Sequence, residues 1–304
     1  MGSDHPVAAS LKVLAGILET QKQRGHETVN ISPEAEALLG AMPRKFMEAA
    51  SLPVAIAQPA VTAAPATAKP ASNGASQSVK VTAAAPQSEE EVRASLNQIF
   101  KDLKSSEECR ALGTLFETVV FATGDPTANI VVVGGAPGAQ EESLRKPLVG
   151  QAWDKLGQML KAMGLPAGDV YFSNVVKFRA KKGDGRLQGT SSRAPTGDEM
   201  RVCLPFLRRE IQAVQPRVIL ALGKIAAEGL VDKGGTVNSF RQESHYFEGV
   251  PVVVTEHPLK VLRDERESSL GELKEKKRAV WEDMLKVMEV AGLKISDKQR
   301  GYFK

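Results

Sequence analysis

The stretch that decides the fold is Ile130–Glu142, IVVVGGAPGAQEE. It opens with four apolar residues, which is typical of a strand buried on both faces. A turn with Ala136, Pro137 and Gly138 follows, and a helical pattern comes after it, so the unit predicts a crevice at the carboxyl end of a parallel sheet. Glycines let backbone N–H groups approach a ligand closely. Ordinary α/β proteins also need a tight turn here, so the glycines alone leave a binding site and a plain turn equally open.

Size and composition set the broad class of protein. The 304 residues have room for one or two domains with a sizeable core. The net charge of +4 permits an anionic partner without requiring one. The two cysteines, Cys109 and Cys203, lie far apart in the sequence, which favours a reducing compartment over a disulfide framework. No apolar run approaches a membrane span and no signal peptide opens the chain, so we expect a cytoplasmic location.

Residues 1–50 predict a small helical segment. Apolar residues recur at helical spacing between Val7 and Gln23, and Ser32-Pro33 is typical of a helix start. This segment either recruits a protein partner or folds back on the main domain.

Residues 51–87 differ from the rest of the chain in composition. They are dominated by Ala, Pro, Thr, Ser and Val, which predicts a disordered linker. We expect the folded domain to occupy residues 88–304 and to begin at the capping box Ser88-x-x-Glu91.

Strand and helix patterns alternate through residues 88–304. Strands are predicted from Ile130 and at 170–178, 217–223 and 250–255, and helices at 152–163, 224–230 and 270–290. This alternation predicts a three-layer α/β/α fold, in which a central, mainly parallel four-stranded sheet carries helices on both faces.

Three polar or glycine-rich elements follow the predicted strands. A glycine-proline turn follows the first, Asn174 stands at the tip of the second, and His257-Pro258 comes after the last. This order resembles the uracil-DNA glycosylase superfamily, most closely its bacterial and archaeal type 4 branch. The resemblance runs from about Cys109 to Val290, and these segments match in order: Gly134 to Gly138, Pro147 to Gly150, Val170 to Lys177, Pro216 to Gly223, and His257-Pro258 with Leu262-Arg263.

The resemblance implies a DNA repair enzyme that flips out and hydrolyses uracil or a related deaminated base. The amide of Asn174 offers one acceptor and a pair of donors, which suits the O4 and N3–H edge of uracil and not that of cytosine. His257 is predicted to donate to uracil O2 as negative charge builds on the departing base. A turn-capping asparagine and a structural histidine are the plain alternatives. The remaining predicted substrate-binding residues are Gly134, Gly135, Ala136, Pro137, Gly138, Leu148 and Phe172.

Basic side chains crowd the loop 179–193, as suits a phosphate backbone, although a solvated charged loop is an equally good interpretation. In the resembling family the segment after the histidine wedges into duplex DNA, and Leu259, Val261 and Leu262 are candidate wedges here. The predicted DNA-binding residues are Arg179, Lys181, Lys182, Arg193, Lys260 and Arg263.

Two motif positions depart from the family pattern. Gly135 stands where the family has a glutamate that helps place the water, and losing a general base typically costs ~10²–10⁴ in rate. Gln140, Glu141 or Glu142 are possible substitutes. Leu148 replaces the aromatic residue on which uracil stacks, an interaction worth ~1–3 kcal/mol per base. Phe172 and Tyr171 are candidate replacements.

A third departure concerns the iron–sulfur cluster of the type 4 branch, which four cysteines hold. The matching positions here are Ser106, Cys109, Phe178 and Cys203. Such clusters normally need four thiolates, so we expect no cluster, no other metal, and two buried, reduced thiols lying near each other.

Two rival functions remain open at this point. One is a catalytically weak or inactive member of the same fold that binds DNA and recruits another protein; the changes at Gly135 and Leu148 favour it. The other is a nucleotide-binding α/β protein, for which Asp154 is a candidate ribose ligand; the His257-Pro258 match argues against it. We expect a monomer that binds DNA, uracil-containing in particular.

Overall fold

The computed structural model describes residues 88–303. The predicted helical segment in residues 1–50 and the predicted linker in residues 51–87 lie outside the described residues. None of the helices in residues 88–303 combines the length and the apolarity needed to cross a membrane.

A six-stranded sheet forms the centre of the domain, in the order β2-β4-β3-β6-β8-β7. Its inner strands β4 (Tyr171–Asn174), β3 (Ile130–Gly134), β6 (Val218–Leu222) and β8 (Val250–Thr255) are parallel. These are the four predicted strands. Two short antiparallel strands, β2 (Thr123–Gly124) and β7 (His245–Phe247), extend the edges and were not predicted.

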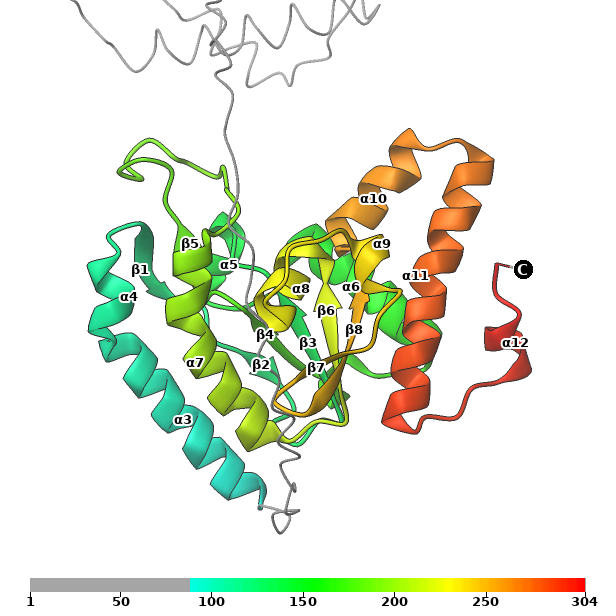
Figure 1. The fold of residues 1–304 in the computed structure, drawn as a ribbon, viewed down its shortest axis with the longest axis horizontal. Helices are drawn as coiled ribbons and strands as arrows, with labels where there is room; N and C mark the ends of the chain where they lie inside the picture. Colours follow the sequence, from blue (N-terminus) through cyan, green and yellow to red (C-terminus); the bar gives the residue numbers. More distant parts are fainter. Residues whose placement is uncertain (1–87, 304) are drawn as a thin grey trace, which may run out of the picture. The chain divides into compact units, whose positions relative to one another are not determined.

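Helices cover both faces of the sheet, as Figure 1 shows, and the predicted three-layer α/β/α architecture is confirmed. Alternate residues of β3 enter different cores: Ile130 and Val132 face one, Val131 and Val133 the other. The first core is covered by α6 (Gly150–Met163), α10 (Pro258–Glu267) and α11 (Leu270–Ala291). The second is covered by α3 (Glu89–Ser105), α4 (Glu107–Ala111), α7 (Gly197–Val214), α8 (Gly223–Val231) and α9 (Val237–Phe240). The remaining short helices are α5 (Ala139–Leu144), η3 (Ala167–Asp169) and α12 (Asp297–Arg300).

The capping box predicted at the start of the domain is present. The Glu91 backbone N–H donates to the Ser88 hydroxyl at 3.3 Å, and the Ser88 N–H donates to the Glu91 carboxylate at 2.7 Å. These bonds satisfy donors that a helix start otherwise leaves unpaired, and they explain why α3 begins at Glu89.

The predicted strand at 170–178 was wrong in extent. It ends at Asn174, and the chain then turns through residues 175–177 into β5 (Phe178–Ala180), which pairs with β1 (Leu115–Val119) in a separate two-stranded sheet. Apolar residues continue through this region because all of it is buried, so hydrophobicity alone gave no sign of the break.

A buried polar network stabilises the end of β4. The Lys177 ammonium and the Glu210 carboxylate form an ion pair at 2.5 Å, and both side chains are fully buried. Ser173 and Tyr171 donate to the same carboxylate at 2.8 and 3.2 Å. Burial and this neighbouring negative charge raise the pKa of Tyr171. Glu210 lies on α7, so the network connects this helix to the strand that ends in Asn174.

Candidate active site

Four parallel strands end at one edge of the sheet, and the motif residues lie just beyond their ends. Gly134 at the end of β3 pairs with Asn174 at the end of β4, and Leu222 at the end of β6 pairs with Thr255 at the end of β8. The predicted turn, Asn174 and His257 therefore share one edge, which is where open α/β sheets bind ligands.

The beginning of the turn packs closely against Asn174. A Cβ atom on Gly134 would collide with the Asn174 amide oxygen and would lie 3.6 Å from Leu148 Cδ2. The N–H groups of Val175 and Val176 donate to the carbonyls of Gly134 and Gly135, both at 2.9 Å. Asn174 is buried, and no hydrogen bond of its side chain occurs among residues 88–303. The structure thus brings Gly134, Leu148 and Asn174 together.

Ile225 fills the space beside Gly135. A Cβ atom at position 135 would lie 2.7 Å from Ile225 Cγ2 and 2.9 Å from Ile225 Cβ, distances that demand a shift of the isoleucine. Sequence reasoning missed Ile225, because only the packing of α8 against the turn reveals it. The side chain absent from position 135 has been replaced by an apolar group from another element.

His257 occupies the N-cap position of α10, and its Nδ1 accepts the Leu259 N–H at 3.2 Å. In the neutral imidazole the proton therefore sits on Nε2, which is free to donate. Burial lowers the pKa of His257, and the charge of Glu141 opposes this shift. Gly223 lies against His257 and has φ +80°, so any side chain there would clash with the imidazole and strain the backbone.

A cavity of about 210 Å³ opens beside His257. Gly135 and Ala136 line it together with the segment 193–195 and the start of α8. Asn174 is not among the residues that line this cavity; its side chain lies against Gly134, the residue before Gly135. The two predicted polar groups thus lie beside consecutive residues of the same turn, Asn174 at Gly134 and His257 at the cavity that Gly135 lines.

The structure contradicts one substrate-binding prediction. Phe172 is only 1% exposed, and its ring packs edge-on against Trp153 at a centroid distance of 5.1 Å. It belongs to the core beneath the site and is not free to stack on a base. Tyr171 is also buried, with its hydroxyl on Glu210. Leu148 is buried, too, but lies next to Asn174.

Two predicted DNA-binding arginines have structural roles instead. Arg179 is 6% exposed; its guanidinium pairs with Glu142 at 3.0 Å and donates to the carbonyls of Gly189 and Ser191. Arg193 binds the buried Glu199 through two nitrogens, at 2.5 and 2.8 Å, which raises the pKa of the arginine. Both hold the loop between β5 and α7 in place. The sequence showed the positive charges but not their partners.

The other predicted cations lie nearer to solvent. Lys182 and Arg263 are exposed, and Lys181 lies over the Phe116 ring at 5.7 Å. The same loop carries Leu187, which is fully exposed and which sequence reasoning missed. Figure 1 shows that the loop between β5 and α7 and the helix α10 project from the same end of the domain, on either side of the sheet.

Of the three candidate wedges, only Leu259 is well exposed. It is 47% exposed at the start of α10, whereas Val261 is buried in the core and Leu262 is half-buried. Leu259 is the second residue after His257, so it projects from the same helix start as the imidazole.

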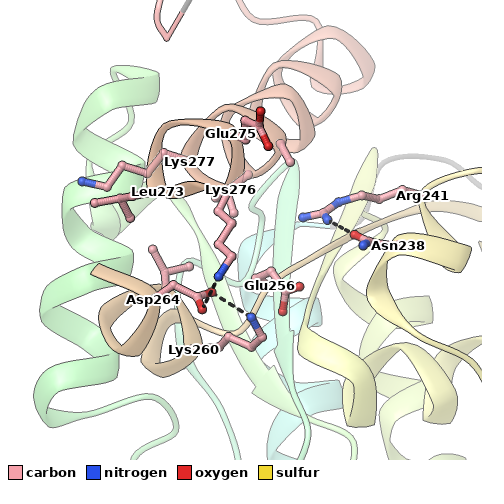
Figure 2. Close-up of a pocket in the computed structure, with 12 residues that line it drawn as sticks. Asn238, Arg241, Glu256, Lys260, Asp264, Leu273, Glu275, Lys276 and Lys277 are labelled. Atoms are coloured by element: carbon pink, nitrogen blue, oxygen red, sulfur yellow. Dashed lines mark hydrogen bonds and ion pairs between the residues drawn. The ribbon is translucent and has the colours of Figure 1, made fainter. Parts of the chain in front are cut away.

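A second cavity, of about 240 Å³, lies between α9, α10 and α11 and is drawn in Figure 2. Lys260, a predicted DNA-binding residue, pairs here with Asp264 at 2.7 Å, and Lys276 approaches the same carboxylate at 3.2 Å (Figure 2). Lys155 and Lys277 pair with Glu265 in the same way. These ion pairs join α10 to α6 and α11, so this cavity is part of the support of the helix that carries His257.

The four positions that match the cluster cysteines form a packed region. Cys109, Phe178 and Cys203 belong to one buried apolar cluster, and the Ser106 hydroxyl accepts the Cys109 N–H at 3.3 Å. Both cysteines are free thiols. A hydrogen bond with Cys203 lowers the pKa of Cys109 to about 7, and the same bond together with burial raises that of Cys203. The two thiols are neighbours, as predicted. In the part of the chain that is described, no group of three or more His, Cys, Asp or Glu side chains is arranged to hold a metal ion.

Comparison with known proteins defines the class. The model of the uracil DNA glycosylase superfamily matches residues 121–285, more than half of the 304-residue chain. The chain therefore belongs to this superfamily.

Its similarity to individual proteins is to the type 4 branch. The type-4 uracil-DNA glycosylase of Archaeoglobus fulgidus is 32% identical over 207 residues, which cover 63% of this chain and 99% of the relative. That of Pyrobaculum aerophilum is 32% identical over 177 residues, 55% of this chain and 85% of the relative. That of Thermotoga maritima is 34% identical over 148 residues, 48% of this chain and 72% of the relative. The resemblance expected from the motifs is confirmed.

Proposed function

We propose that this protein is a DNA repair glycosylase that hydrolyses the N-glycosidic bond of deoxyuridine in DNA. The observation that carries the proposal is the state of His257: its Nδ1 is occupied by a backbone N–H, so Nε2–H is free beside the glycine-rich turn. The relatives named type-4 uracil-DNA glycosylases support the substrate. The binding-module alternative is not favoured by these comparisons.

The chemistry follows from what each group can do. As the bond between the sugar and N1 of uracil breaks, the electron pair remains on the base, and its charge spreads to O2. A neutral imidazole that donates from Nε2 stabilises this anion, and a preorganised donor of this kind is worth ~10²–10³ in rate. Burial keeps His257 neutral by lowering its pKa. The side-chain amide of Asn174 makes no hydrogen bond among the described residues. We propose that it binds the O4 and N3–H edge of uracil.

For DNA binding we propose two contacts, on either side of the turn. Lys182 on the loop between β5 and α7 reaches the phosphate backbone, together with its neighbour Lys181. Leu259, at the start of α10, is the apolar wedge that fills the gap left by the flipped base. We place the enzyme in the cytoplasm as a monomer, with residues 1–50 available to a protein partner.

We also propose that the domain folds without an iron–sulfur cluster. Only two of the four matching positions carry thiols, Phe178 belongs to the same buried apolar cluster, and the Ser106 hydroxyl accepts the Cys109 N–H. This donor set does not fit a cluster that requires four thiolates. Protein prepared without oxygen is expected to contain neither iron nor sulfide in stoichiometric amount; about four irons per chain would overturn the proposal.

A strand-cleavage assay tests the proposed function. A labelled oligonucleotide with one uracil is incubated with an excess of protein and treated with alkali, which breaks the strand at an abasic site. We expect cleavage at the uracil and none in an oligonucleotide with cytosine at that position. Asn174→Ala is expected to lose the activity. Bound but uncleaved DNA at high protein excess would contradict hydrolysis.

A further inference from the structure

Gly135 stands where the resembling family has a glutamate. The space that a side chain at this position would need is already occupied. Ile225 occupies the space that a side chain at position 135 would need, with Cγ2 at 2.7 Å from the place of its Cβ. Any carboxylate that acts in this site must therefore come from another residue.

The acidic residues around the site have different partners. Glu142 is paired with Arg179 at 3.0 Å, and Glu199 is paired with Arg193 at 2.5 Å. Glu256 lines the cavity between α9, α10 and α11. The carboxylate left facing the turn is that of Glu141.

Glu141 bridges the two motif segments of the site. Its Oε2 accepts the Gly138 N–H at 3.1 Å, and its Oε1 accepts the Val149 N–H at 3.3 Å. A carboxylate oxygen has two lone pairs, so each oxygen keeps one acceptor site for a further donor. The side chain is half-buried and has no cationic partner among residues 88–303. The carboxylate is thus fixed in position and has acceptor sites left over.

The charge of Glu141 also reaches His257. It raises the pKa of the imidazole and so opposes the effect of burial. The two residues are 116 positions apart in the chain, so the sequence did not indicate this interaction.

We propose that Glu141 is the catalytic carboxylate of this enzyme, in place of the side chain absent from position 135. This inference rests on the proposed function. When the bond from C1′ to N1 breaks, the negative charge of Glu141 stabilises the sugar cation. The oxygen of a water molecule then adds to C1′, and the proton that it loses passes to the Glu141 carboxylate. The base leaves as an anion and takes its proton from solvent.

Glu141→Gln, measured under single-turnover conditions on uracil-containing DNA, tests the role. We expect the excision rate to fall by about 10²-fold, while the melting temperature and the affinity for DNA with a non-hydrolysable 2′-fluoro deoxyuridine stay close to those of the wild type. Glu90→Gln is the matched control: it removes an exposed carboxylate from the first turn of α3, outside the site, and its excision rate is expected to equal that of the wild type.

Added azide separates proton removal from a merely structural role, because this anion attacks C1′ without losing a proton. We expect azide to accelerate Glu141→Gln, with a glycosyl azide detected by mass spectrometry, and to leave the wild-type rate unchanged. A variant within threefold of the wild type, or a slow, destabilised variant that azide does not rescue, would overturn the role of Glu141 and leave uracil excision intact. A wild-type protein that releases no uracil would instead refute the proposed function.

Discussion

Two regions depart from the type 4 sequence pattern: the edge of the sheet around His257, and the buried contact around Cys109 and Cys203. The first contains an open cavity, and the second is packed. At the sheet edge a cavity of about 210 Å³ stays open, and the polar groups there keep free donors and acceptors. The two cysteines, in contrast, are buried in the apolar core together with Phe178, and the Ser106 hydroxyl accepts the Cys109 N–H.

The difference indicates which parts of the site can be exchanged. Our proposal that the domain folds without a cluster implies that apolar packing and a buried ion pair stabilise this region in its place, because both contribute to the free energy of unfolding. A donor aimed at a developing charge is not replaceable by packing, because its effect depends on position and direction. We therefore expect changes near Cys203 to alter stability and changes near His257 to alter rate.

The largest expected effect is that of Glu210→Ala, which tests the closed region. The variant leaves the Lys177 ammonium buried and unpaired, so we expect a loss of about 3–5 kcal/mol in the free energy of unfolding. Equilibrium unfolding in urea measures it. The double variant Lys177→Met with Glu210→Leu removes both charges and is expected to be markedly more stable than Glu210→Ala. Equal losses in both variants would argue against an ion-pair role.

His257→Asn tests the open region and is expected to lower the single-turnover excision rate by ~10²–10³. Asparagine is a good N-cap residue and can accept the Leu259 N–H as the imidazole does, so the fold should keep its stability. Rate constants and melting temperatures measured on the same preparation separate the two effects. A rate unchanged within threefold would remove His257 from the mechanism.

Gly135→Glu restores the residue that the family has at this position. It tests whether Ile225 occupies the space that the glutamate side chain needs. The new side chain must displace Ile225, so we expect a destabilisation of about 1–3 kcal/mol from overpacking. Combining it with Ile225→Ala should recover part of the loss, as a double-mutant cycle in chemical denaturation would show. Additive losses in the cycle would mean that the two positions do not compete for space.

The smallest expected effect is the dependence of stability on pH. Because the pKa of His257 in the folded state lies below the usual 6.5, the unfolded chain binds the proton more readily. The stabilising contribution of the neutral imidazole is therefore complete above about pH 6.5 and declines as the pH falls below that value. Melting temperatures between pH 8 and pH 5 should fall more steeply for the wild type than for His257→Asn. Parallel curves would contradict the shifted pKa.

The sequence by itself determined the elements with strong local signals. The run of apolar residues from Ile130 specified a strand buried on both faces, and Ser88 with Glu91 specified a helix start, because strand burial and helix capping depend on neighbours along the chain. It also placed Asn174, His257 and the turn at one edge, because parallel strands in alternation with helices end on the same side.

Only the tertiary structure decided what each side chain contacts. Arg179 and Arg193 looked like DNA ligands, but Glu142 and Glu199 hold them in place. Phe172 looked like a stacking platform, but Trp153 covers it in the core. Ile225 fills the space beside Gly135, and the carboxylate of Glu141 accepts the N–H groups of Gly138 and Val149. These contacts join elements far apart in the chain, and periodicity and residue type carry no information about which distant groups meet.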